Sequence, residues 1–102
     1  MTPIKLFTAT ANKVGTKVSV EVAGEHIIAI AASAAFGGGT LTVTILDNAT
    51  GIALAGDAAK YVFTGVFEAF KLFLAPGMAV QVTLTGATSP NIDSVFMYPT
   101  ER

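Results

Sequence analysis

Few side chains in this sequence could carry out chemistry. There is one histidine, His26, and no cysteine, so neither a thiol nucleophile nor a thiolate zinc site can form. His26 could activate a serine or threonine hydroxyl only if the fold brought the two groups together. The nucleophile-elbow pattern G-x-S-x-G is absent. We therefore interpret His26, which follows Glu25 at the expected start of a strand, as a structural residue.

The acidic and glycine-rich segments also lack the spacing of known sites. The run Asp47-Asn48-Ala49-Thr50-Gly51 does not match an EF-hand loop. We interpret it as a turn in which Asp47 and Asn48 bond to nearby backbone groups. The three glycines at 37–39 lack the Lys-Ser/Thr pair of a phosphate-binding loop. The sequence therefore predicts no catalytic residue, no metal and no cofactor, and we expect a protein that is not an enzyme.

The composition indicates one apolar domain with unusually little charge. The chain has 102 residues, of which 52% are hydrophobic and 13% charged, with a net charge of −1. This composition excludes intrinsic disorder and gives no electrostatic basis for binding nucleic acid or an anionic membrane. A small domain with so little charge is expected to bury surface against copies of itself or a larger partner. The alternative is a neutral surface, coated with threonine, that has no partner.

Period-two alternation predicts strands along most of the chain. In residues 40–46, Leu41, Val43 and Ile45 share one face and three threonines share the other. A turn over 47–51 and a short return strand over 52–54 complete an expected hairpin. Pro76-Gly77 is the pair that a type II turn prefers at its centre. Further strands are expected over 4–8, 17–22, 79–85 and 92–98, with Val18, Val20 and Val22 facing inward in the second of these.

Two segments fit either a helix or a strand. Residues 25–36 form a nearly unbroken apolar run that suits a helix with a glycine stop, or a strand around 26–32 that is buried on both faces. Residues 61–74 carry a helical stripe of phenylalanines, but also fit strands over 61–63 and 66–73. We expect strands in both segments. In a strand, Glu68 and Lys71 have opposite parity, so one of them must point inward unless a bulge intervenes.

The spacing of these elements predicts an all-β fold. Eight or nine strands separated by Gly, Pro, Asn and Asp turns are typical of a single β-sandwich or jelly roll of about eight short antiparallel strands. We expect an N-terminal lead or arm over residues 1–13 and one sandwich domain over 14–102. The apolar stretch after Lys5 is too short for a signal peptide, and no segment suits a membrane helix. We expect a soluble protein.

Half of the chain resembles a known family. The segments 39–45, Leu74-Ala75-Pro76-Gly77-Met78 and 80–92, the last containing V-Q-V-T-L-T-G-A-T, are similar to small virion proteins of tailed bacteriophages. The resemblance covers residues 39–96. It implies a β-sandwich or jelly roll with a mechanical role. Some of these proteins decorate or cement the capsid as trimers, and others are small head or tail components.

The resemblance implies specific partners and a location. It implies a homo-oligomer, with a trimer favoured, that binds the major capsid protein on the capsid surface of the virion after synthesis in the host cytoplasm. No nucleic acid and no membrane partner is expected. The lead could reach a neighbouring subunit, and the expected interface residues are Ile4, Leu6, Phe7 and Phe36. The alternatives are another phage head or tail component, and a carbohydrate- or cell-surface-binding module. A continuous apolar face would favour a virion component, and exposed Tyr or Phe beside a shallow groove would favour the binding module.

Overall fold

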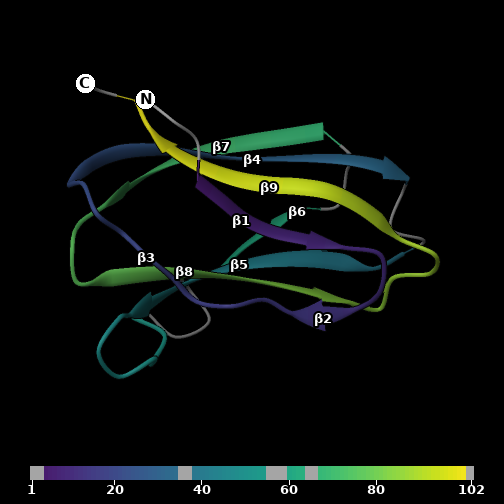
Figure 1. Cartoon of the computed structure of the whole chain (residues 1–102), viewed down its shortest axis with the longest axis horizontal. Coiled ribbons are helices and arrows are strands. Elements are labelled where there is room, and N and C mark those ends of the chain that lie inside the picture. The colour runs from purple at the N-terminus through teal and green to yellow at the C-terminus, as the bar shows by residue number, and fades with distance from the viewer. Residues whose placement is uncertain (1–3, 35–37, 55–59, 64–66, 101–102) are drawn as a thin grey trace.

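The computed structural model has an all-β fold. It describes residues 4–34, 38–54, 60–63 and 67–100. These residues form nine strands in two antiparallel sheets that pack face to face as a β-sandwich, with no helix in the described ranges (Figure 1). The predicted fold class is therefore confirmed.

The two sheets differ in size. We call the four-stranded sheet, with strand order β1-β9-β4-β7, sheet A, and the five-stranded sheet, with order β2-β8-β5-β6 and β3 also paired to β8, sheet B. Sheet A consists of β1 (Ile4–Ala9), β4 (Gly24–Ala34), β7 (Phe67–Leu74) and β9 (Asn91–Pro99). Sheet B consists of β2 (Lys13–Val14), β3 (Val18–Ser19), β5 (Thr40–Asp47), β6 (Lys60–Phe63) and β8 (Met78–Thr85).

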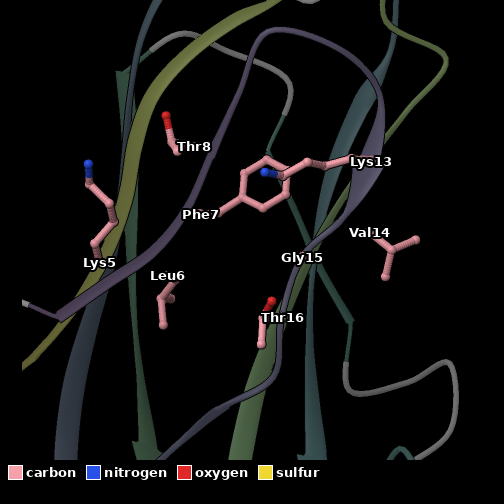
Figure 2. A pocket seen from close by; sticks show the side chains of 8 residues that line it. All are labelled: Lys5, Leu6, Phe7, Thr8, Lys13, Val14, Gly15 and Thr16. Atoms are coloured by element: carbon pink, nitrogen blue, oxygen red, sulfur yellow. The ribbon is translucent and has the colours of Figure 1, made fainter.

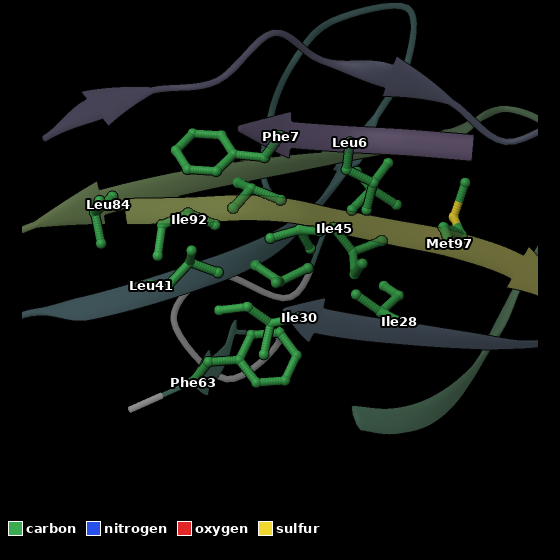
Figure 3. Close-up of a cluster of buried hydrophobic side chains, with 14 of the residues drawn as sticks. Leu6, Phe7, Ile28, Ile30, Leu41, Ile45, Phe63, Leu84, Ile92 and Met97 are labelled. Atoms are coloured by element: carbon green, nitrogen blue, oxygen red, sulfur yellow. The ribbon is translucent and has the colours of Figure 1, made fainter. Parts of the chain in front are cut away.

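Alternation along the strands fills the space between the sheets. On sheet B, Leu41 lies opposite Leu84 and Val43 opposite Val82, and all four side chains are fully buried. On sheet A, buried residues of β4 and β9 point into the same space, although a register shift between the two strands interrupts the alternation between Ile92 and Val95 (Figure 3). Burial of each such side chain contributes about 1.5–3 kcal/mol relative to exposure. The sheet A residues with 1% exposure or less are Ile28, Ile30, Ile92, Val95 and Met97.

The turn between β7 and β8 has the geometry predicted from its sequence. Gly77 has a φ of 99°, which L side chains rarely adopt. The Met78 amide donates a hydrogen bond of 3.1 Å to the Ala75 carbonyl oxygen, which closes the four-residue turn. Pro76 at the second position and Gly77 at the third are the residues that a type II turn needs.

Both ambiguous segments are strands, as expected. Residues 24–34 form β4, which pairs on one side with β7 and on the other with β9. The β4–β7 register has no bulge, so Glu68 and Lys71 point to opposite faces of sheet A. Glu68 lies opposite Ile30 on the inner face, and Lys71 lies opposite Ile27 on the outer face. Glu68 is half-buried near the start of an edge strand. An edge position of this kind lets the side chain of a charged residue reach solvent from the inner face.

Two expected strands are shorter than predicted. The strand expected over 17–22 is reduced to β3, and Val22 is 43% exposed instead of facing inward. The chain leaves sheet B after Val20, whose amide bonds to the Met78 carbonyl, and reaches sheet A at Gly24. The return strand expected over 52–54 is a single bridge between Leu46 and Ala53. Period-two spacing shows which residues of a strand share a face, but not where pairing stops. In residues 17–22 the pairing with β8 stops where the chain crosses to sheet A.

The N-terminal segment belongs to the sandwich from Ile4 onward. Within the expected lead, 1–13, strand β1 pairs antiparallel with β9 at the edge of sheet A. Lys13 then begins β2, which pairs with β8 in sheet B. The chain therefore crosses from one sheet to the other within these residues and closes one side of the sandwich (Figure 1). Strand β1 and the start of β2, which lie within the expected lead, therefore take part in the two sheets.

Candidate interaction surface

The expected interface residues lie in or beside the core. Leu6 and Phe7 are 6% and 4% exposed, and Ile4 packs against the core cluster. Two successive residues of β1 can face inward because its register with β9 shifts between Lys5 and Phe7, as happens at a β-bulge. Phe36 lies outside the described residues. In the folded monomer, Leu6 and Phe7 therefore offer little surface to a partner.

A shallow hollow of about 310 Å³ lies over β1 and the segment that contains β2 (Figure 2). Its polar groups come from Lys5, Thr8, Lys13 and Thr16. The Lys13 ammonium lies 5.4 Å from the centre of the Phe7 ring, a distance at which cation–π attraction acts. The described lining contains ammonium and hydroxyl groups but no carboxylate or imidazole. The hollow therefore lacks an acid–base pair.

His26 and Asp47, the two polar residues considered from the sequence, each make hydrogen bonds to residues close to them in the chain. His26 is 2% exposed, and its Nδ1 donates a hydrogen bond of 2.9 Å to the Gly24 carbonyl oxygen. Asp47 Oδ2 accepts hydrogen bonds from the Thr50 amide, at 3.1 Å, and the Thr50 hydroxyl, at 2.8 Å. These contacts hold a strand start and a turn, as interpreted from the sequence. Within the described ranges, no three His, Asp or Glu side chains gather into a possible metal site.

The outer face of the two central strands of sheet B, β5 and β8, carries hydroxyl and amide groups, and the exposed side chains of Val14 on β2 and Val62 on β6 lie on either side of it. Thr40 lies opposite Thr85, and Thr42 lies opposite Thr83. The next outward pair along the same two strands is Thr44 and Gln81. Such groups hydrogen-bond to water, so this face suits direct contact with solvent.

The outer face of sheet A is mostly apolar. Ile27 lies opposite Tyr98 and Ala29 opposite Phe96 where β4 pairs with β9. On the other side of β4, Ala29 also lies opposite Ala69 of β7. Phe73, near the end of β7, is 78% exposed. We define the apolar face of sheet A as Ile27, Ala29, Ala31, Ala69, Phe73, Phe96 and Tyr98.

The charged side chains of this outer face lie at its margins. Lys5 and Lys71 are on β1 and β7, the two edge strands of sheet A. Glu25 lies near the start of β4, where its carboxylate accepts a 3.2 Å hydrogen bond from the Thr100 hydroxyl. An apolar centre with charges at the rim is the arrangement found in protein–protein interfaces.

The central strand β4 explains why this face is apolar. Its inner residues Ile28 and Ile30 are 0% and 1% exposed. Its outer residues Ile27, Ala29 and Ala31 are also apolar, yet they are only partly buried. A strand that is apolar on both faces is typical of a sheet covered on both sides. The unbroken apolar run over 26–32 was the signal in the sequence for this face, which is separate from the N-terminal residues expected at an interface.

Comparison with known proteins gives no relative: no family model, no curated protein and no solved structure matches this chain. In the part of the chain that the structure describes, no helix is long and apolar enough to cross a membrane. A function for the chain therefore rests on its own residues, chiefly on the contrast between its two outer faces.

Proposed function

We propose that this chain is a structural protein of a tailed-bacteriophage virion that decorates or cements the capsid. In this proposal the apolar face of sheet A binds the major capsid protein, and the protein bridges neighbouring capsid subunits. The observation that carries the proposal is the apolar outer face of β4 and β9, on the opposite side of the sandwich from the threonine-rich outer face of β5 and β8. The resemblance of residues 39–96 to small virion proteins is the reason for proposing the major capsid protein as the partner.

The composition of this face supports docking on another protein. Phe73, Phe96 and Tyr98 supply aromatic side chains of the kind that carry much of the binding energy in interfaces. Burying apolar surface contributes about 25 cal/mol for each Å² removed from water. Ala29 and Ala31 on the central strand β4 have small side chains that project little from the sheet, so that a partner can approach the backbone closely.

The shape of the face favours a virion component over a carbohydrate-binding module. A sugar-binding site would place an exposed aromatic ring beside a shallow groove with polar groups. Here the aromatic side chains lie on the surface of a sheet, and the described hollow is lined by β1 and the segment around β2, whose residues are not part of the apolar face.

The proposal predicts a mechanical effect on capsids. Protein that binds only the intact lattice stabilises it by RT ln(1 + [L]/Kd) per site, which is about 2.7 kcal/mol when free protein is at about 100 times Kd. Particles assembled without the chain should take up the purified protein and then release their contents at a higher temperature. The measurement is co-sedimentation, followed by a thermal release assay with and without added protein. Particles equally stable in both conditions would contradict the cement role.

A pair of matched variants tests which face binds. Phe73 on β7 and Val62 on β6 are both exposed apolar residues on edge strands, at 78% and 53% exposure, but they belong to different sheets. Phe73→Ser should weaken particle binding at least about tenfold, as expected for an aromatic interface residue. Val62→Ser should leave binding unchanged. Equal losses in the two variants would count against sheet A as the docking face.

A further inference from the structure

We draw no further inference here: the strongest candidate, the shallow hollow over β1 and the segment that contains β2, where Lys5 and Lys13 line the surface together with Thr8 and Thr16, carries none because nothing in the structure shows which ligand or partner would occupy it.

Discussion

Gly15 lies directly against the ring of Phe7. A Cβ atom on Gly15 would be 2.7 Å from Phe7 Cδ1 and 2.7 Å from the Val82 carbonyl oxygen. The Gly15 amide also donates a 2.7 Å hydrogen bond to that same oxygen. The segment after β2 is therefore in contact with both β1 and β8, and the position has no room for a side chain.

Gly15→Ala should destabilise the fold. The added methyl group can be accommodated only if the Phe7 ring and the β8 backbone move, which costs about 1–3 kcal/mol in a packed core. In a domain of this size each kcal/mol lowers the melting temperature by about 4–8 °C. Thermal melting followed by circular dichroism measures the shift. Thr16→Ala, at the exposed neighbouring position, is the control and should stay within about 0.5 kcal/mol of the wild type.

Phe7→Ala should be among the most destabilising single substitutions. The side chain is 4% exposed within the core cluster, and truncating a buried phenylalanine costs about 3–5 kcal/mol. Lys5→Ala, which changes an exposed residue of the same strand, should cost less than about 0.5 kcal/mol. Urea unfolding of both variants gives the comparison. A Phe7→Ala protein as stable as Lys5→Ala would show that β1 does not contribute to the core.

Deletion of residues 1–13 should abolish cooperative folding. The deletion removes all of β1, including Leu6 and Phe7, and leaves β9 without its edge partner. This outcome is the opposite of that expected for a detachable arm. A truncated protein that keeps a sharp thermal transition and its strand signal in circular dichroism would restore the arm hypothesis.

His26 should contribute to stability through both packing and its hydrogen bond. His26→Ala leaves a cavity and removes the donor to the Gly24 carbonyl oxygen, so we expect a loss of about 1–3 kcal/mol. His26→Leu retains most of the volume and isolates the loss of the hydrogen bond. Chemical denaturation of the two variants separates the contributions. A leucine variant less stable than the alanine variant would contradict this division.

Asp47 should stabilise its turn modestly. Asp47→Ala removes the acceptor for two hydrogen bonds from Thr50, which are exposed, and should cost about 0.5–1.5 kcal/mol. Asp47→Asn keeps one acceptor oxygen and should recover part of the loss. Differential scanning calorimetry resolves the three proteins. An unchanged melting temperature for Asp47→Ala would mean that the backbone alone holds the turn.

The amino-acid sequence determined most of the local structure of this protein. Alternation in residues 40–46 defined which side chains of β5 share a face, and Pro76-Gly77 defined the turn into β8. The single histidine and the absence of cysteine bounded its chemistry. These features are local, because side chains alternate along a strand with a period of two and a turn depends on neighbouring residues.

The tertiary structure decided what each face and edge of the sheets contacts. A register shift against β9 turns both Leu6 and Phe7 inward, and no local pattern in the sequence specifies that shift. The same holds for the two outer faces and for the position of β7 at the edge of sheet A. Periodicity shows which residues lie on one face, but pairing partners are distant in the sequence. Whether a face is covered, and by what, therefore depends on how the whole chain pairs and packs.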